Sequence, residues 1–251
     1  TLTNLKTDYL DIYQFHCADR VFAPGDGSGM YEAMLEAKKQ GKIRHIGITA
    51  HKIGVAEEAV ESGLYETLQF PFSYLSAERE LALVENCRKH NMGFIAMKGL
   101  AGGLINHSAA AMAYMTQFDN VLPIWGIQKE SELDGWLAFM DETPQMTDEI
   151  RTFIAKECQE LTGDFCRGCG YCMPCPAGIM INQCARMSLM LRRAPSAAWL
   201  TEEMQEEMKK IEGCLECGAC KKKCPYELDT PTLLKKNYED YKRVLAGEVE
   251  V

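Results

Sequence analysis

The sequence lacks the features that would direct it to a membrane or to a nucleic acid. It contains no run of about eighteen apolar residues, so it predicts no membrane span. No signal peptide is recognisable at its start. The formal net charge is -9 and no basic stripe offsets it, which argues against a nucleic-acid partner.

Two other absences concern the fold and the extent of the chain. No G-x-G-x-x-G follows the first expected strand, so the dinucleotide-binding fingerprint is missing there. The chain begins at Thr1 instead of a methionine, and its opening residues already read as the approach to a buried strand. We therefore expect that a further N-terminal segment precedes it. The 251 residues are enough for one large domain and a small one.

Cysteine, by contrast, is abundant, and eight of the twelve cysteines fall into two matching runs. The runs read Cys166-Arg-Gly-Cys169-Gly-Tyr-Cys172-Met-Pro-Cys175-Pro and Cys214-Leu-Glu-Cys217-Gly-Ala-Cys220-Lys-Lys-Lys-Cys224-Pro. Three thiolates spaced two residues apart suit one face of a cubane cluster. In two-cluster ferredoxins a fourth cysteine, followed by proline, ligates the other cluster. The second run keeps that spacing, whereas the first has two residues in place of three before its last cysteine.

The hypothesis is therefore two 4Fe-4S clusters with exchanged fourth ligands. One cluster would use Cys166, Cys169, Cys172 and Cys224, and the other would use Cys214, Cys217, Cys220 and Cys175. Structural zinc is an alternative, although its C-x2-C pairs are usually separated by a longer loop. Disulfide bonds are a second alternative, but they require an oxidising compartment, which nothing in the sequence indicates.

Four cysteines lie outside the runs and are expected to be small buried hydrophobes: Cys17, Cys87, Cys158 and Cys184. Because the first run is irregular, Cys184 is also a candidate replacement ligand.

The first 140 residues alternate between strand and helix patterns. Strands are predicted over 8–15, 43–49, 66–70, 93–97 and 121–124, and helices over 30–40, 54–62, 77–90, 108–117 and 130–140. Such alternation predicts parallel strands joined by crossover helices. Five units of this kind suit an open doubly wound sheet or most of an eight-stranded barrel.

The rest of the chain is predicted to be mainly helical. A linking helix is predicted over 147–161, ended by Gly163, and further helices start near Thr201 and at Thr230. Between the cysteine runs, one apolar stripe is formed by Met180, Cys184, Met187 and Leu191.

Three stretches resemble the fourth, fifth and seventh strands of the aldo-keto reductases: residues 5–16, 41–49 and 95–103. The cysteine region is similar to the ferredoxin-like tail of one branch of that family. The resemblance implies an α/β fold, namely a partial (β/α)8 TIM barrel made of the last five strand-helix units over 1–145. A small helical dicluster ferredoxin-like domain would follow over 146–251.

The resemblance also implies site residues. Aldo-keto reductases bind NADP(H) at the C-terminal ends of the strands and reduce carbonyls with tyrosine, lysine, aspartate and histidine. Only the histidine is matched, by His16, for which a buried core histidine is the alternative. Thr49 and Gln69 correspond to the residues that hold the nicotinamide carboxamide, and Met97 replaces the stacking aromatic.

Other positions depart from the family. Ala50 stands in place of an asparagine, and the residues that grip the 2'-phosphate of the adenosine are replaced by Glu132 and Trp136. A glutamate would repel that phosphate, so NADP(H), NAD(H) and no nucleotide remain open.

Two functions follow as hypotheses. In the first, the protein is an oxidoreductase in which two clusters relay electrons to or from a nucleotide or a small-molecule substrate at the barrel mouth. In the second, the barrel is catalytically inert and supports an electron-transfer or redox-sensing module. An electron-carrier protein is a candidate partner. The basic run 221–223 tunes the potential of a nearby cluster, docks such an acidic carrier, or is a solvated surface. The resemblance implies a reducing cytoplasmic location.

Overall fold

The computed structural model describes residues 1–127, 129–161, 165–193 and 196–251. Its contacts form two compact units, which are described separately. Unit 1 comprises Thr1–Gly99 and Ser108–Ile154, and unit 2 comprises Leu100–His107 and Ala155–Val251. The division into domains at residue 145 stays a prediction.

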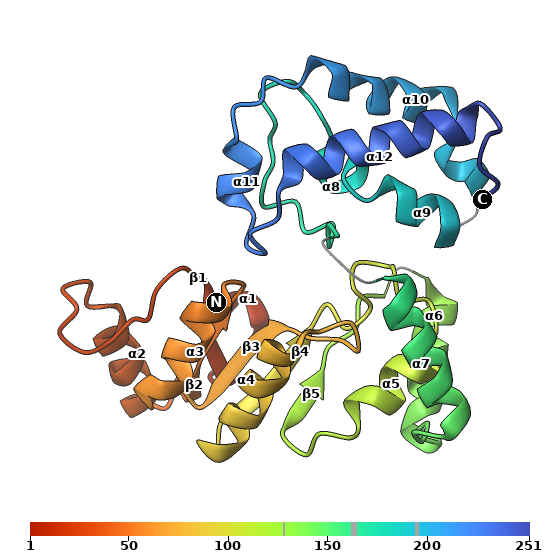
Figure 1. The fold of residues 1–251 in the computed structure, drawn as a ribbon. Helices are drawn as coiled ribbons and strands as arrows, with labels where there is room; N and C mark the ends of the chain where they lie inside the picture. Colours follow the sequence, from red (N-terminus) through yellow and green to blue (C-terminus); the bar gives the residue numbers. More distant parts are fainter. Residues whose placement is uncertain (128, 162–164, 194–195) are drawn as a thin grey trace. The chain divides into compact units, whose positions relative to one another are not determined.

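Unit 1 is built on a five-stranded parallel sheet (Figure 1). The strands are β1 (Leu10–Ala18), β2 (Ile43–Ala50), β3 (Thr67–Pro71), β4 (Gly93–Met97) and β5 (Val121–Pro123), paired in that order. The helices are α1 (Leu2–Leu5), α2 (Met30–Lys39), α3 (Ile53–Ser62), α4 (Glu78–Lys89), α5 (Ser108–Met115) and α6 (Glu130–Asp141). The predicted partial α/β barrel with five strand-helix units is confirmed.

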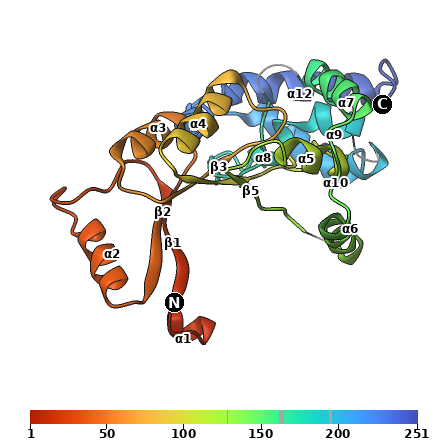
Figure 2. The same cartoon turned by 90° about the horizontal axis from the view of Figure 1, so that it is seen from below.

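The core of unit 1 lies between the sheet and its helices. In Figure 2, α3 and α4 run along one face of the middle strands, and α3 contacts β2 and β3. Ile48 and Leu68 of the sheet are fully buried, and they belong to the same apolar cluster as Ala56 and Val60 of α3. A parallel sheet needs such helical cover, because crossover connections place helices over its faces. All five strands run in the same direction, so their C-terminal ends lie along one side of the sheet. This row of strand ends is called the sheet edge below.

Unit 2 is helical, as predicted. Its elements are the end of α7 (Asp148–Glu160), α8 (Ile181–Cys184), α9 (Met187–Arg193), η1 (Ser196–Trp199), α10 (Glu202–Lys209), η2 (Lys210–Gly213), α11 (Ala219–Lys223) and α12 (Thr230–Leu245). The apolar stripe predicted between the cysteine runs is divided between α8 and α9. Gly163, the predicted end of the linking helix, lies outside the described residues.

The core of unit 2 packs the long helix α12 against the shorter ones. Leu234 and Tyr241 of α12 are buried together with Met187 and Leu191 of α9. Asn237 of α12 is also buried, and its side chain accepts the backbone N–H of Ser188 and donates to the carbonyl of Ala185. Across the described residues of both units, no helix combines the length and apolarity needed to cross a membrane.

Gly47 in β2 is a point of close packing. A Cβ at this position would lie 2.2 Å from Thr67 Oγ1 and 3.2 Å from the Thr67 carbonyl oxygen. We expect Gly47→Ala to destabilise unit 1 by about 1–3 kcal/mol, because the added methyl group forces the neighbouring strand to shift. The measurement is urea unfolding followed by tryptophan fluorescence, to which Trp125 and Trp136 of unit 1 contribute.

Gly54→Ala is the matched control in the same unit. Gly54 lies in α3, and a Cβ added there would have no atom within 4 Å. This variant should leave stability unchanged or raise it by up to about 1 kcal/mol, since alanine restricts the unfolded chain more than glycine. Equal destabilisation by both substitutions would contradict the packing argument.

Candidate cluster cavities and strand-end residues

A first cavity in unit 2, called cavity A, gathers four cysteines. It is lined by Cys166, Cys169, Cys172 and Cys224. Burial and, to a smaller extent, the charges of Cys166 and Cys169 together raise the pKa of the Cys172 thiol to about 12. The three cysteines of the first run therefore lie close to one another, and Cys224 reaches them from the end of the second run.

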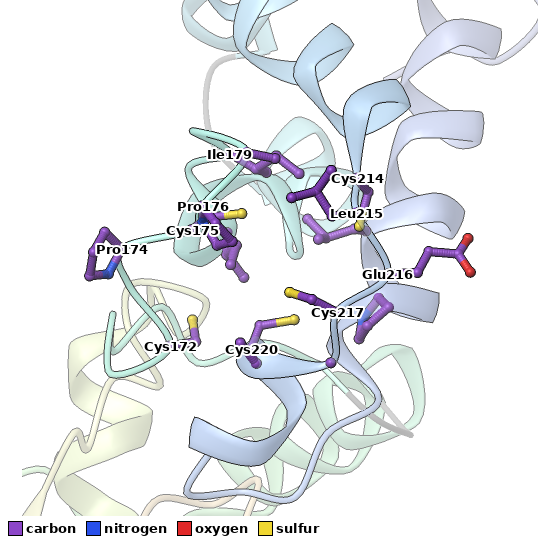
Figure 3. A pocket seen from close by; sticks show the side chains of 16 residues that line it. Cys172, Pro174, Cys175, Pro176, Ile179, Cys214, Leu215, Glu216, Cys217 and Cys220 are labelled. Atoms are coloured by element: carbon purple, nitrogen blue, oxygen red, sulfur yellow. The ribbon is translucent and has the colours of Figure 1, made fainter.

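A second cavity in unit 2, called cavity B, gathers the other four cysteines of the two runs. It is lined by Cys175, Cys214, Cys217 and Cys220, and also by Cys172, which lines cavity A as well. Figure 3 shows the sulfur atoms of Cys175, Cys217 and Cys220 turned toward a common space, while the Glu216 carboxylate points away from it. Burial raises the pKa of Cys220, and Cys214 and Cys175 contribute in the same direction.

Apart from Cys172, which lines both cavities, each cysteine of the two runs lines the cavity to which the crossed-ligand hypothesis assigns it. Cys175 leaves its own run to join cavity B, and Cys224 leaves its run to join cavity A. The chain path is consistent with this arrangement, since Cys220 lies in the first turn of α11 and Cys224 directly follows the last residue of that helix. The assignment of these residues as ligands stays a prediction.

The chemistry of the donor sets fits iron-sulfur clusters. Four cysteines line cavity A and five line cavity B, with Cys172 common to both, and the walls of cavity B also include the apolar side chains of Ile179 and Leu234. Within the described ranges, no three His, Cys, Asp or Glu side chains are grouped closely enough to hold one metal ion. Thiolates around a zinc ion lie only about 2.3 Å from the metal, whereas a cubane cluster presents a separate iron to each ligand.

Glycine is required at two turns of the cysteine loops. Gly168 and Gly218 have φ values of 68° and 67°, a region that side chains disfavour. Gly218 directly precedes α11, and the N–H of Gly168 donates to Cys166 Sγ at 3.4 Å. Both turns help to direct the neighbouring cysteines inward.

The four other cysteines have different environments. Cys87 and Cys184 are buried and Cys158 is half-buried, whereas Cys17 is exposed, so the prediction of burial was wrong for Cys17. Cys184 lines neither cavity but packs in the apolar core of unit 2, where burial raises its pKa to about 11. Its placement gives no support to a role as replacement ligand.

The four predicted nucleotide and catalytic residues lie at or near the C-terminal ends of strands. His16 is near the end of β1, Thr49 of β2, Gln69 of β3 and Met97 of β4. His16 is exposed, so the alternative of a buried core histidine was wrong. Gln69 Nε2 lies 3.6 Å from Met97 Sδ.

Thr49 has a structural contact of its own. Its hydroxyl oxygen accepts the backbone N–H of Cys17 at 2.6 Å, and the side chain is buried. This bond secures an irregular end of β1, where the pairing register shifts between Phe15 and Ala18 and Cys17 has a φ of 51°.

Sequence reasoning missed His51, which follows β2 directly. Its Nδ1 lies 3.7 Å from Cys17 Sγ, and only 6% of the residue is exposed. Burial lowers the pKa of His51 to about 4, and the charges of Lys98 and His16 act in the same direction. The available signal was a titratable residue immediately after a buried strand, at the sheet edge where functional groups gather.

The two positions expected to meet the 2'-phosphate have local roles. Glu132 lies in the first turn of α6 and accepts the backbone N–H of Lys129 at 3.3 Å. Trp136 stacks on Trp125, with ring centroids 4.1 Å apart. Trp125 fills the space beside Gly99, because a Cβ there would lie 2.5 Å from its ring.

Comparison with known proteins agrees with this architecture. Residues 1–122 match the aldo/keto reductase family, and residues 165–229 match the 4Fe-4S dicluster domain. The resemblance to iron-sulfur aldo-keto reductases is therefore confirmed for these two segments.

Curated relatives align with less than half of the chain. The uncharacterized oxidoreductase YqkF of Bacillus subtilis (strain 168) is 32% identical over 110 residues, which are 42% of this chain and 33% of the relative. Aldo-keto reductase AFTS1 of Alternaria alternata is 27% identical over 109 residues, covering 41% of this chain and 29% of the relative. The chain spans about a third of the length of these curated relatives.

A solved structure supports the fold. Aldo-keto reductase AKR11C1 from Bacillus halodurans, in its apo form, matches with a TM-score of 0.51 and 22% sequence identity. The match covers 62% of this chain and 64% of that one. At this identity the likeness establishes the fold alone.

His51 provides a test of the strand-end geometry. We expect its imidazole to titrate with a pKa of about 4 in the folded protein, measured by NMR and assigned by the loss of its resonance in His51→Gln. The unfolded chain binds this proton near the ordinary value of 6.5, so folding stability should fall as the pH drops from about 6.5 to about 4. A value near 6.5 in the folded protein would contradict the buried placement.

Proposed function

We propose that the chain is part of an iron-sulfur oxidoreductase of aldo-keto reductase type, in which two 4Fe-4S clusters couple single-electron transfer to redox chemistry at the sheet edge. The observation that carries this proposal is the division of eight cysteines between cavities A and B. When bound, the clusters would supply one-electron steps that a hydride carrier alone cannot perform.

The cysteines would hold the clusters as thiolates, and their burial is consistent with that role. A buried thiol such as Cys172 has a raised pKa and is inert toward solvent, so metal binding must displace its proton. The apolar walls of cavity B would limit the access of water and thereby affect the reduction potential.

The strand ends would receive a nicotinamide nucleotide. Thr49 accepts one backbone hydrogen bond, and its O–H remains able to donate to a carboxamide oxygen. His16 is exposed and could orient a substrate carbonyl by hydrogen bonding. The negative charge of Glu132 favours NAD(H) over NADP(H), because a 2'-phosphate would be repelled.

Electrons would enter or leave through cavity B. Its ligand candidate Cys217 is exposed, and the adjacent Leu215 has 65% of its surface exposed. An exposed apolar residue beside a redox centre suits a transient contact with an electron-carrier protein. The redox partner at the sheet edge would be a small-molecule substrate.

A second candidate is a catalytically inert barrel that supports an electron-transfer or redox-sensing module. Two observations favour it. Ala50 is fully buried and has no group with which to bind a carboxamide, and the Trp125–Trp136 stack occupies space beside β4.

The cluster content is the first test. Protein purified without oxygen should contain about eight irons and about eight acid-labile sulfides per chain, with two interacting EPR signals after reduction. About four irons would contradict the two-cluster proposal, and zinc without sulfide would exclude electron transfer by this unit.

Single substitutions test the crossed ligand sets. Cys175→Ala should alter the same EPR signal as Cys217→Ala, and Cys224→Ala should alter the same signal as Cys169→Ala, because each pair lines one cavity. Cys158→Ala is the matched control and should retain both signals, since Cys158 lies on α7 and lines neither cavity. If Cys175→Ala instead behaves like Cys169→Ala, the ligand sets follow the two runs without crossing.

Anaerobic titration with nucleotides separates the two candidate functions. NADH should bleach the cluster absorbance at lower concentration than NADPH. Glu132→Gln keeps the capping acceptor but removes the charge, so it should tighten NADPH binding by about fivefold, the effect of one charge about 4 Å away in water. Glu130→Gln in the same helical turn should have a smaller effect. Bleaching by neither nucleotide would favour the inert barrel.

A further inference from the structure

Cavities A and B differ in the charges beside them. Cavity A is flanked by two arginines, Arg186 and Arg167. Near cavity B, the charge of Lys235 reaches Cys214, but its Nζ is paired with Glu216 Oε1 at 2.5 Å, and both side chains are mostly exposed. An exposed ion pair is screened by solvent, so it contributes little net positive charge to cavity B.

Arg186 is held tightly against the loop that carries Cys166. It lies between α8 and α9, and its Nη1 donates to the carbonyl of Gly102. A Cβ on Gly168 would lie 2.8 Å from Arg186 Cζ, so the guanidinium packs against that glycine directly. Only glycine at position 168 permits this approach.

The guanidinium also acts on the thiolate electrostatically. The Arg186 charge lowers the pKa of Cys166, opposing the larger effect of burial, which raises it. Burial in turn lowers the pKa of Arg186, and the charge of Cys166 opposes this effect. The two groups are therefore close enough to interact in a partly buried environment.

Arg186 has no carboxylate partner among the described residues, and its Nε is buried without a hydrogen bond. A partly buried cation with no anionic partner is costly unless a negative charge lies nearby. Four thiolates with their cluster would be such a charge. Arg192 and Arg193, in the same region, are instead each paired with a carboxylate, Asp240 and Glu157.

We propose that Arg186 makes the cluster of cavity A the one with the higher reduction potential, so that an electron shared by the two clusters resides mainly there. This inference rests on the proposed function, because it requires a cluster in each cavity. An added electron makes a cluster more negative, and a fixed positive charge beside it stabilises the reduced form. The proposal concerns the relative electron affinities of two sites and involves no transfer of atoms or protons.

The test is a redox titration followed by EPR on the full chain, purified without oxygen. Arg186→Gln should lower the electron affinity of the cavity A cluster about tenfold, a downward shift of about 59 mV for one electron. The potential of the cavity B cluster should stay nearly constant. Cys217→Ala identifies which signal belongs to cavity B.

The variant Arg186→Lys distinguishes the effect of the positive charge from the effect of the guanidinium on loop packing. It keeps the positive charge but loses the planar fork that bonds Gly102 and packs on Gly168. If charge sets the potential, the cavity A cluster of the lysine variant should have a reduction potential close to that of the parent protein. If both variants lower the potential equally, the effect comes from loop packing and the proposal is overturned.

Arg243→Gln is the matched control for loss of one positive charge in the same unit. Arg243 lies near the end of α12 with 55% of its side chain exposed and pairs with Glu248, so its removal should shift neither potential measurably. Equal shifts in Arg186→Gln and Arg243→Gln would overturn the proposal. Absence of two clusters from the parent protein would instead contradict the proposed function itself.

Discussion

The structure of unit 2 depends on one electrostatic constraint: its cysteine thiols are buried beside other thiols, which opposes their ionisation. Ionising Cys172 is opposed by burial and by three neighbouring cysteines, so thiolates can form there only with a compensating positive charge. Bound iron would supply most of that charge, and Arg186 contributes to it at Cys166. The short helices of unit 2 are consistent with this constraint, since metal binding supplies folding free energy that a small apolar core does not.

The helix break between α8 and α9 shows what periodicity predicts and what it does not. The apolar spacing of Cys184, Met187 and Leu191 correctly indicated a buried face, because all three are in the core. It did not indicate that the helix stops at Cys184 and restarts at Met187. Arg186 occupies that break, so its guanidinium reaches the cysteine loop and Gly102.

The sequence predicted the alternation of parallel strands and helices in unit 1 well, because it depends on local spacing and on short connections. The division of the cysteines into two ligand sets stays a prediction. The strand-end chemistry was less predictable. The exposure of Cys17 depends on a register shift between β1 and β2, and the burial of His51 depends on the packing around that shift. Neither property can be derived from the residue types alone, since a one-residue change of register moves a side chain to the other face.

The loop 100–107 belongs to unit 2. It follows β4, the strand that ends with Met97, yet it packs as part of unit 2. Its Gly102 carbonyl accepts from Arg186, and its Leu104 carbonyl accepts from Arg193, which also pairs with the buried Glu157. Two arginines therefore hold this loop by its backbone. Arg186 also acts on the charge of Cys166, so a single side chain joins the backbone of this loop to the lining of cavity A.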